Sequence, residues 1–573
     1  MRPAILAVAV FGLAMTTRLI AFDVALTADE GDWMQRVVRF GAAVARGNAD
    51  GTYRTGHPGV TVTWIGLLGI GPQRLAPLAT GRYIQAPRLQ RALGYLEALT
   101  AARLGIVVAT SVLASLIVLL TCELVGSVAG MLGGLLLLLD PYVVGTSRVL
   151  HVDALLPSLM TVSALAGLLY WIGGRSGRWP YLVLSAFAGG LALLTKSPAI
   201  FVALYFGLVG LATARPWRGP SRHLLLAIGT WGGIAAAVYV ALWPALWVDP
   251  IGRLGDLVEF ARTTGGAPHE RGSYFFGRAL AGDPGPLFYP VTLAFRLGPI
   301  ATVGLLALAV VLLAGARRHR SLLAPAGWLA VYAILFVTMM SLGVKKLDRY
   351  LLPALMPLTI LAGVGLWLAV SRLLRGNLAA VALGLVVVGQ AGLLSRAYPY
   401  PLAAYNPLLG GTAVARQVMV VGWGEGLEQV AAYLNARPDA ARLDVALTYD
   451  NVLRPRFSGT TVSDLPYVFE GPGQARPPVG YFVVYVNSAQ RELVPSLIRQ
   501  AVEDGSPDFT AYVHGVPYAW LYRAPDLSER ASEQSVPLDD DPDERRSPRG
   551  RAREAVGPTV ENDRFRASPG RTM

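Results

Sequence analysis

The sequence is poor in cysteine and in charged residues. Cys122 is the single cysteine among 573 residues, so no internal disulfide bond and no cysteine-based metal site can form. Charged residues make up 15% of the chain, whereas soluble proteins carry about 25%. Hydrophobic residues make up 53%, and the mean hydropathy is +0.46. Runs such as GIVVATSVLASLIVLL approach the roughly 20 apolar residues that cross a bilayer, which predicts a polytopic α-helical membrane protein.

The net charge of +13 does not indicate nucleic-acid binding. Its basic residues gather in short loops between apolar runs, as in membrane proteins, and form no basic face on a soluble domain. The first apolar run, 3–22, contains Arg18 and lacks a convincing small-residue cleavage site. We therefore expect it to be an uncleaved first helix rather than a signal peptide.

The pattern of apolar runs predicts about eleven transmembrane helices. They lie at about 3–22, 101–121, 128–145, 152–172, 181–195, 198–214, 224–247, 297–314, 323–342, 350–370 and 378–395. The basic loops GGRSGRWP, ARPWRGPSRH, GARRHRS and SRLLRGN then share one side, which the positive-inside rule assigns to the cytoplasm. Merging the short fifth and sixth segments into one helix would break this agreement.

The loops at 23–100 and 248–296, and all residues after 395, are then expected to face outward. The first of these loops begins with an amphipathic pattern in which Trp33, Val37 and Phe40 share one face, which predicts a helix lying in the membrane interface. We expect residues 1–395 to form a single transmembrane domain.

The composition changes after the last apolar run. A connector at 396–409 leads to residues 410–526, where helical patterns accompany the strand-like runs RLDVALTY and GYFVVYVN. A hairpin is expected to turn at His514 and Gly515. This region is predicted to be a small extracytoplasmic α/β domain, and the charged stretch 527–573 is predicted to be disordered.

Two adjacent acids, Asp29 and Glu30, follow the first apolar run in ALTADEGDWMQ. Thr27 and Glu30 match the S/T-x-x-E capping box, so helix capping alone accounts for the pattern. Capping leaves Asp29 free to face a cavity, and the two interpretations are compatible.

Further ionisable residues stand at the predicted outer ends of other helices: Arg148, His151 and Asp153 in GTSRVLHVDALL, Lys196 in LLTKSPAI, and Lys345, Lys346 and Arg349 in GVKKLDRYLLPALMPL. Each alone is typical of an interfacial anchor. Together they gather acids and cations at one depth, which predicts a site. There a carboxylate can act as general base, and Lys or Arg can bind a phosphate leaving group carried by a lipid.

Six stretches occur in the order found in one enzyme class: ADEGDW, GHPGVTVTW, SRVLHVDALL, GGLALLTKSPAIF, GDPGPLFYPVTLAFRLGP and KKLDRYLLPALMPLTILAG. This ordered set resembles the GT-C superfamily of glycosyltransferases, near the family 39 protein O-mannosyltransferases and the ArnT-like transferases. YNPLLGG, GWGEGLEQVAAYLN and YFVVYVNSAQRE further resemble the outer domain of a bacterial branch that uses polyprenyl-phosphate sugars.

The resemblance implies that residues 1–395 form a GT-C-like transmembrane catalytic domain. It implies a glycosyltransferase, of hexosyl or pentosyl type, in the bacterial plasma membrane. It would move a sugar from a polyprenyl-phosphate-linked donor to a protein, glycan or lipid acceptor at the outer face. The resemblance implies catalytic roles for Asp29, as an inverting general base, and for its neighbour Glu30. It implies substrate-binding roles for His57, Arg148, Asp153, Lys196, Lys345, Lys346, Arg349 and Tyr350.

Several alternatives stay open. The chain has HPG where many relatives have HPP or EKP. The spacing of the residues identifies no metal ligand set, and a divalent metal ion held by His57, Asp29 and Glu30 is an open alternative. A lipid or sugar transporter without transferase activity is the main competing function, although no internal repeat supports it. A non-catalytic assembly subunit is a second. The glycines of VVGWGEGL depart from G-x-G-x-x-G and are interpreted as a turn before a helix.

Overall fold

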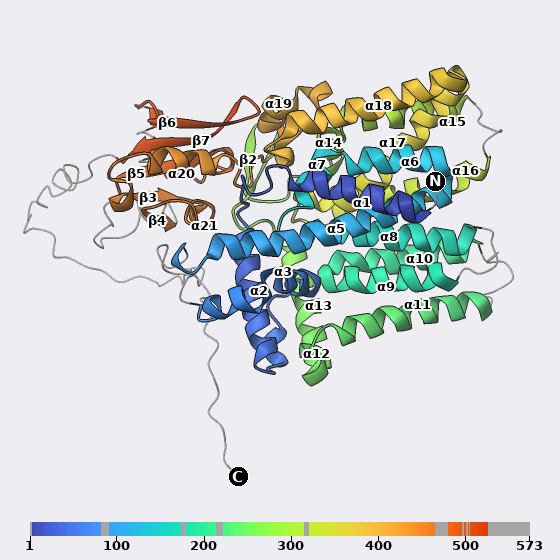
Figure 1. Ribbon diagram of the computed structural model, residues 1–573, viewed down its shortest axis with the longest axis horizontal. Helices are drawn as coiled ribbons and strands as arrows, with labels where there is room; N and C mark the ends of the chain where they lie inside the picture. Colours follow the sequence, from blue (N-terminus) through green and yellow to red (C-terminus); the bar gives the residue numbers. More distant parts are fainter. Residues whose placement is uncertain are drawn as a thin grey trace, which may run out of the picture. The chain divides into compact units, whose positions relative to one another are not determined.

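The computed structural model describes residues 3–81, 91–173, 179–213, 222–314, 320–463, 479–495, 498–499, 502–503 and 505–524. In this part of the chain, long apolar helices run side by side (Figure 1). These helices, which the sequence places in the membrane, are α1 (Pro3–Leu19), α5 (Tyr95–Val125), α6 (Ser127–Leu138), α8 (Val152–Ile172), α9 (Trp179–Thr195), α10 (Ile200–Thr213), α11 (Arg222–Ala241), α15 (Pro299–Leu313), α16 (Arg320–Ser341), α17 (Leu352–Leu373) and α18 (Gly376–Ala397).

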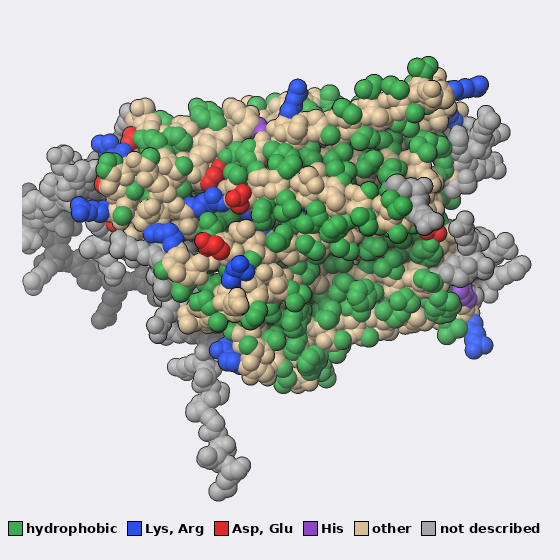
Figure 2. Space-filling view, in the orientation of Figure 1, with side chains coloured by type: hydrophobic (Ala, Val, Ile, Leu, Met, Phe, Trp, Pro, Cys, Tyr) green, Lys and Arg blue, Asp and Glu red, His purple; other side chains and the backbone are tan. Residues whose placement is uncertain are grey.

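Helix α8 lies at the centre of this arrangement. It is buried along its whole length because α5, α9, α10, α16 and α17 all pack against it. The peripheral helices instead leave large apolar side chains exposed, among them Ile334, Leu385 and Val388. Figure 2 shows hydrophobic side chains spread over the helical surface. An apolar surface of this extent fits contact with lipid.

Glycines allow the central helices to approach closely. A Cβ built on Gly363 of α17 would lie 2.3 Å from the Cα of Gly133 in α6, and one on Gly365 would lie 2.1 Å from the carbonyl oxygen of Gly304 in α15. Small residues at crossings bring backbones into contact, which is the main source of packing energy between helices in lipid. Helix α17, whose N-terminal end carries part of the site, is therefore locked between α6 and α15.

All eleven predicted membrane segments coincide with helices. Six of them are long and apolar enough to cross a membrane, and a bent pair, α14 (Phe288–Arg296) with α15, makes a seventh if counted as one span. Four others, α1, α6, α9 and α10, are shorter apolar helices. The polytopic membrane architecture is confirmed, and the total of eleven stays a prediction.

Two predicted segments show breaks. The third ends as α6 at Leu138, after which Asp140 caps the short helix α7 (Pro141–Thr146) by accepting a hydrogen bond from the Val143 N–H at 3.0 Å. The fifth and sixth segments are separate helices, α9 and α10, because Lys196 and a 3₁₀ turn, η3 (Ser197–Ala199), interrupt them. Three of the four basic loops lie largely outside the described residues, whereas SRLLRGN joins α17 to α18.

The two long loops carry structure of their own. The first contains the predicted amphipathic helix, α2 (Glu30–Ala45), which buries Trp33, Val37 and Phe40, followed by η1 (Asp50–Thr52) and α3 (Val60–Leu78). The second contains α12 (Ala245–Val248), α13 (Pro250–Gly266), a hairpin of β1 (Ser273–Phe275) with β2 (Arg278–Leu280), and α14. Its hairpin and helix α13 were not expected from the sequence.

A five-stranded mixed sheet follows the last membrane helix, with strand order β4-β3-β5-β7-β6. The strands are β3 (Asp444–Leu447), β4 (Thr460–Ser463), β5 (Tyr481–Tyr485), β6 (Phe509–Val513) and β7 (Val516–Arg523). Strand β3 pairs in parallel with β4 and β5, and β7 pairs antiparallel with β5 and β6. The predicted hairpin is confirmed, because His514 and Gly515 adopt the positive φ values of a tight turn.

The short helix α19 (Gly411–Val418) precedes the sheet, and α20 (Leu427–Asn435), α21 (Asp450–Leu453) and α23 (Val486–Gln490) pack around it. The remaining 3₁₀ turns are η6 (Asp348–Leu351), which lies directly before α17, and η7 (Pro401–Ala403), η8 (Pro407–Leu409) and η9 (Ala440–Arg442), which follow α18. The small α/β region is thus confirmed. The residues up to Ala524 form one compact unit, so the boundaries at 395 and 410 stay a prediction. The predicted disordered stretch, 527–573, lies outside the described residues.

Replacing Gly363 with alanine is expected to lower the melting temperature, because the added methyl group would meet the backbone of Gly133. Overpacking of this kind costs about 1–3 kcal/mol. Gly392→Ala in α18 is the matched control, since a Cβ there meets nothing within 4 Å. Thermal unfolding of both variants in detergent measures the difference, and equal melting temperatures would contradict the close α6–α17 contact.

Candidate functional site

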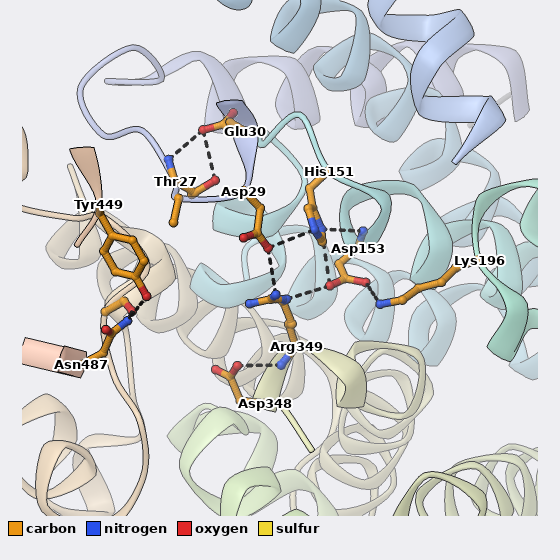
Figure 3. Close-up of polar contacts among 12 residues, drawn as sticks. Thr27, Asp29, Glu30, His151, Asp153, Lys196, Asp348, Arg349, Tyr449 and Asn487 are labelled. Atoms are coloured by element: carbon orange, nitrogen blue, oxygen red, sulfur yellow. Dashed lines mark hydrogen bonds and ion pairs between the residues drawn. The ribbon is translucent and has the colours of Figure 1, made fainter. Parts of the chain in front are cut away.

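Four ionisable side chains from four separate elements form one continuous chain of ion pairs (Figure 3). Asp29 stands at the N-terminal end of α2, Asp153 in the first turn of α8, Lys196 directly after α9, and Arg349 in η6 before α17. The order along the chain of contacts is Asp29, Arg349, Asp153, Lys196. Each was predicted as a site residue from the sequence, and the structure brings all four together.

Arg349 is the centre of this arrangement. Its Nη2 lies 2.9 Å from the Asp29 Oδ2, and its Nε lies 3.1 Å from the Asp153 Oδ2. The fork of a guanidinium suits this role, since its donors point in fixed directions and can reach two carboxylates at once. One face of the guanidinium stacks on the Trp423 ring at 4.3 Å.

Asp153 is buried and paired with cations on two sides. Its Oδ1 accepts a hydrogen bond from the Lys196 Nζ at 2.8 Å, while its Oδ2 faces Arg349. The Lys196 ammonium also lies 4.1 Å from the centre of the Tyr350 ring. A buried carboxylate with two cationic partners stays ionised and holds both cations in place.

His151 joins the two carboxylates and is the N-cap of α8. Its Nδ1 accepts the backbone N–H of Asp153 at 3.1 Å, so in the neutral ring the proton resides on Nε2. That Nε2 lies 3.4 Å from the Asp29 Oδ2. The rings of Trp33 and Trp423 pack edge-on against the imidazole, with centroids at 5.7 and 5.1 Å.

Asp29 is partly exposed, with 36% of its side chain accessible. Burial by itself would raise its pKa, but the charge of Arg349 outweighs it, and hydrogen bonds from His151 and Trp423 add to the effect. The pKa of Asp29 is therefore well below the usual carboxyl range, and Asp29 is a carboxylate in the ligand-free protein.

Glu30 points away from this chain of ion pairs. Its carboxylate accepts hydrogen bonds from the Arg103 Nε at 2.6 Å, the Thr27 N–H at 2.8 Å and the Leu150 N–H at 3.0 Å. The reciprocal half of the predicted capping box is thus present, although α2 begins at Glu30 itself. Glu30 is 1% exposed and has structural partners for both oxygens, so a structural function fits it better than the predicted catalytic one.

Two of the predicted binding residues also have structural partners. The Arg148 guanidinium donates to the carbonyl oxygens of Ile20 and Pro399 at 2.7 and 2.9 Å, which ties the end of α1 to the chain after α18. The buried Lys346 ammonium forms an ion pair with Asp283, whose side chain is exposed. Arg148 therefore lies apart from the chain of ion pairs. Lys346 lines a polar cavity that Asp29 and Arg349 also line, which is described below.

An apolar cavity of about 300 Å³ adjoins Lys196. Its walls include Leu156, Phe336 and Met340, and its polar end includes the side chains of His57, Asp153, Lys196, Lys345, Arg349 and Tyr350. Burial of His57, together with the nearby Lys196 charge, lowers the imidazole pKa to about 3, so that ring is neutral. The polar end thus carries three cationic side chains and one carboxylate, whereas the rest of the cavity wall is apolar.

A polar cavity of about 520 Å³ lies on the other side of Arg349. Asp29 and Trp423 line it, as do residues of the sheet region, among them Tyr449, Asn487 and Arg491. Asn487 donates to the Tyr449 hydroxyl (Figure 3). Arg491 donates to the same hydroxyl at 3.2 Å. These wall residues were not found from the sequence, because nothing in their local pattern links them to Asp29. Arg349 lines both cavities.

The metal ligand set considered from the sequence is not assembled. His57 lines the apolar cavity, Asp29 lines the polar cavity, and Glu30 faces Arg103. Within the described residues, no group of three or more His, Cys, Asp or Glu side chains could hold a metal ion.

Glu30→Gln is expected to destabilise the protein far more than Asp29→Asn. A glutamine would set an N–H₂ group against donors that now bind a carboxylate, and breaking a buried ion pair costs about 3–5 kcal/mol. Asp29 is partly exposed, so its neutral variant loses less. Melting temperatures of the two variants in detergent test the assignment, and a larger drop for Asp29→Asn would contradict it.

Comparison with known proteins links this site to one family model. Residues 91–243, about a quarter of the chain, match the model described as dolichyl-phosphate-mannose-protein mannosyltransferase. The matched stretch includes His151, Asp153 and Lys196. No curated protein matches the chain.

Solved structures with a similar chain course have low sequence identity. ArnT from Cupriavidus metallidurans in the apo state matches at 15% identity and a TM-score of 0.46, with 90% of this chain and 97% of that chain covered. The same protein bound to undecaprenyl phosphate matches at 17% identity, with the same TM-score and coverage. The archaeal oligosaccharyltransferase AglB from Archaeoglobus fulgidus, in complex with an inhibitory peptide and a dolichol-phosphate, matches at 12% identity and a TM-score of 0.43, with 93% and 75% covered.

The family match confirms the resemblance that the sequence motifs suggest. It covers α5 to α11, which include the central helix α8 and the elements that hold Asp153 and Lys196. Over these residues, the chain is similar to the dolichyl-phosphate-mannose-protein mannosyltransferases.

Proposed function

We propose that this protein is an inverting glycosyltransferase of a bacterial plasma membrane, which moves a sugar from a polyprenyl phosphate carrier to an acceptor at the outer face. One observation carries the proposal. The ion-pair chain from Asp29 to Lys196 stands between an apolar cavity with a cationic end and a polar cavity, and Arg349 lines both. A lipid-linked donor and a polar acceptor need such a pair of adjoining spaces.

The apolar cavity suits the lipid phosphate. Its walls accommodate the first isoprene units, and Lys196, Lys345 and Arg349 bring positive charge to its polar end. Lys345 is half-buried, and its ammonium has no ion-pair partner among the described residues. Cations in a water-poor site stabilise the negative charge that develops on a departing phosphate.

Asp29 is the proposed general base. The acceptor O–H or N–H gives its proton to the carboxylate, the acceptor atom bonds to the anomeric carbon, and the bond from that carbon to the phosphate oxygen breaks. The electron pair leaves with polyprenyl phosphate, which the cations stabilise. Attack from the side opposite the phosphate inverts the anomeric carbon.

A carboxylate clamped by Arg349 is a weak base, because its pKa lies far below neutral pH. Donor binding removes this obstacle, since the donor phosphate competes with Asp29 for the Arg349 guanidinium. A looser Asp29–Arg349 pair raises the pKa of Asp29 toward a range in which it can accept a proton. Asp153 keeps Arg349 and Lys196 in place during the exchange.

Asp29→Asn is expected to lower kcat by about 100-fold or more, the usual contribution of a general base, while the protein still folds and binds undecaprenyl phosphate. Purified full-length protein would be assayed with a panel of polyprenyl-phosphate sugars. Asp256→Asn, which changes an exposed acid of α13, is the matched control. Full turnover by Asp29→Asn would refute the assignment, and transport of the lipid without sugar transfer by the wild type would favour a transporter.

The acid limb of kcat is expected at higher pH than the acid limb of kcat/KM. The second reports the free enzyme, in which Arg349 holds the pKa of Asp29 below the usual value of about 3.9. The limb of kcat reports the donor complex, in which Arg349 no longer holds the pKa of Asp29 so low. Rate profiles from pH 3 to 8 are expected to show the acid limb of kcat while kcat/KM stays level to the acid end of that range. A kcat/KM limb at the same pH as the kcat limb, or at higher pH, would contradict the exchange of partners at Arg349.

A further inference from the structure

The glycines of VVGWGEGL, which the sequence predicts to form a turn before a helix, lie directly before α20. In the structure, Gly422, Gly424 and Gly426 all have positive φ, at 86°, 129° and 87°. These conformations strongly favour glycine, and they fold the loop 422–426 tightly onto itself. A Cβ on Gly424 would lie 2.4 Å from the carbonyl oxygen of Leu26, so the loop also presses against the segment that leads into α2.

Hydrogen bonds fix this loop from both sides. The Trp423 carbonyl accepts the N–H of Ala28 at 2.8 Å, one residue before Asp29. From the sheet, the Tyr485 hydroxyl accepts the Gly424 N–H at 2.9 Å, and Asn487 donates to the Gly422 carbonyl at 2.9 Å. The loop therefore forms a braced bridge between the sheet and the start of α2.

The side chain that this bridge presents is Trp423. Its ring covers one face of the Arg349 guanidinium at 4.3 Å and packs edge-on against His151 at 5.1 Å. Both partners contact the Asp29 Oδ2. Trp423 also donates a hydrogen bond to the Asp29 carboxylate. A residue from the sheet region thus touches the proposed base and the two groups that hold it.

We propose that Trp423 is a positioning residue of the transfer reaction, which holds the Arg349 guanidinium where it pairs with both Asp29 and Asp153. The inference deepens the proposed function and rests on it. It assigns the sheet region a direct part in catalysis, in addition to forming the wall of the polar cavity.

The physical reason is orientation. An arginine that bridges two carboxylates can rotate about its side-chain bonds and lose one of them to water. A flat aromatic ring against one face blocks water and leaves the in-plane N–H groups free for hydrogen bonding. When a donor phosphate arrives, the same fixed plane directs an N–H of Arg349 toward it.

Three variants of the full-length protein separate positioning from simple docking of the sheet region. Trp423→Leu removes the ring, and Trp423→Phe retains an aromatic face. Arg456→Ala is the matched control: it removes another hydrogen bond between the two regions, from Arg456 to the Asp23 carbonyl, and leaves Arg349 untouched. Each variant would be tested for its melting temperature, its Kd for undecaprenyl phosphate, and its kcat and KM with the donor panel.

Trp423→Leu is expected to weaken undecaprenyl phosphate binding and to lower kcat, each by about tenfold, the effect of losing a desolvated cation–π contact. Trp423→Phe is expected to recover most of the binding, because the ring face against Arg349 returns, and only part of kcat, because the N–H that Trp423 donates to Asp29 is still absent. Arg456→Ala is expected to bind and turn over like the wild type. Equal values for Trp423→Leu and wild type, or equal losses of binding in the Phe and Leu variants, would overturn the positioning role. If Arg456→Ala lost as much binding and turnover as Trp423→Leu, the positioning role would be wrong, and the loop would only dock the sheet region.

The two proposals fail differently in this experiment. A wild-type protein that neither binds undecaprenyl phosphate nor transfers sugar overturns the proposed function and, with it, the inference about Trp423. A wild type that does both, alongside an unaffected Trp423→Leu variant, overturns the inference alone.

Discussion

The arrangement of the site depends on one guanidinium. Arg349 is drawn to Asp29 on one side and to Asp153 on the other, and these carboxylates belong to helices that are far apart in the sequence. Ionisable groups at membrane depth are costly unless they are paired. The pairing therefore brings the start of α2, the start of α8 and the turn before α17 to one point, and the two cavities lie around that point.

The surrounding helices make this pairing possible. Helix α8 is enclosed on all sides and sets the position of Asp153 and His151, while α17 is held by glycine contacts with α6 and α15. Glu30 and Arg103 connect the first loop to α5 and thereby fix the helix start at which Asp29 lies. The two adjacent acids thus have different roles. Asp29 faces the polar cavity, and Glu30 anchors the backbone that carries Asp29.

Local patterns in the sequence were enough to predict the helices, the sheet region and the four residues of the ion-pair chain. Helix periodicity and ionisable residues at helix ends are local signals, and Asp29, Lys196 and Arg349 carry them. The capping-box pattern indicated that Asp29 rather than Glu30 is free to face a cavity, although the family resemblance gave both a catalytic role. No local pattern separated Arg148 from Asp153, since which of them faces a cavity depends on packing against distant segments. Trp423 gave no signal for the same reason: its contact with Arg349 joins residues on separate elements.

Lys345 and Lys346 are neighbours in the chain and yet line different cavities, the first the apolar one and the second the polar one. The segment between α16 and η6 therefore borders both cavities, and two consecutive residues of it line different ones. Its length is constrained, because inserting or deleting one residue would displace at least one lysine from the cavity that it lines. Sequence change in this segment is then expected to occur by substitution. Insertions and deletions are expected to be rare wherever both cavities are used.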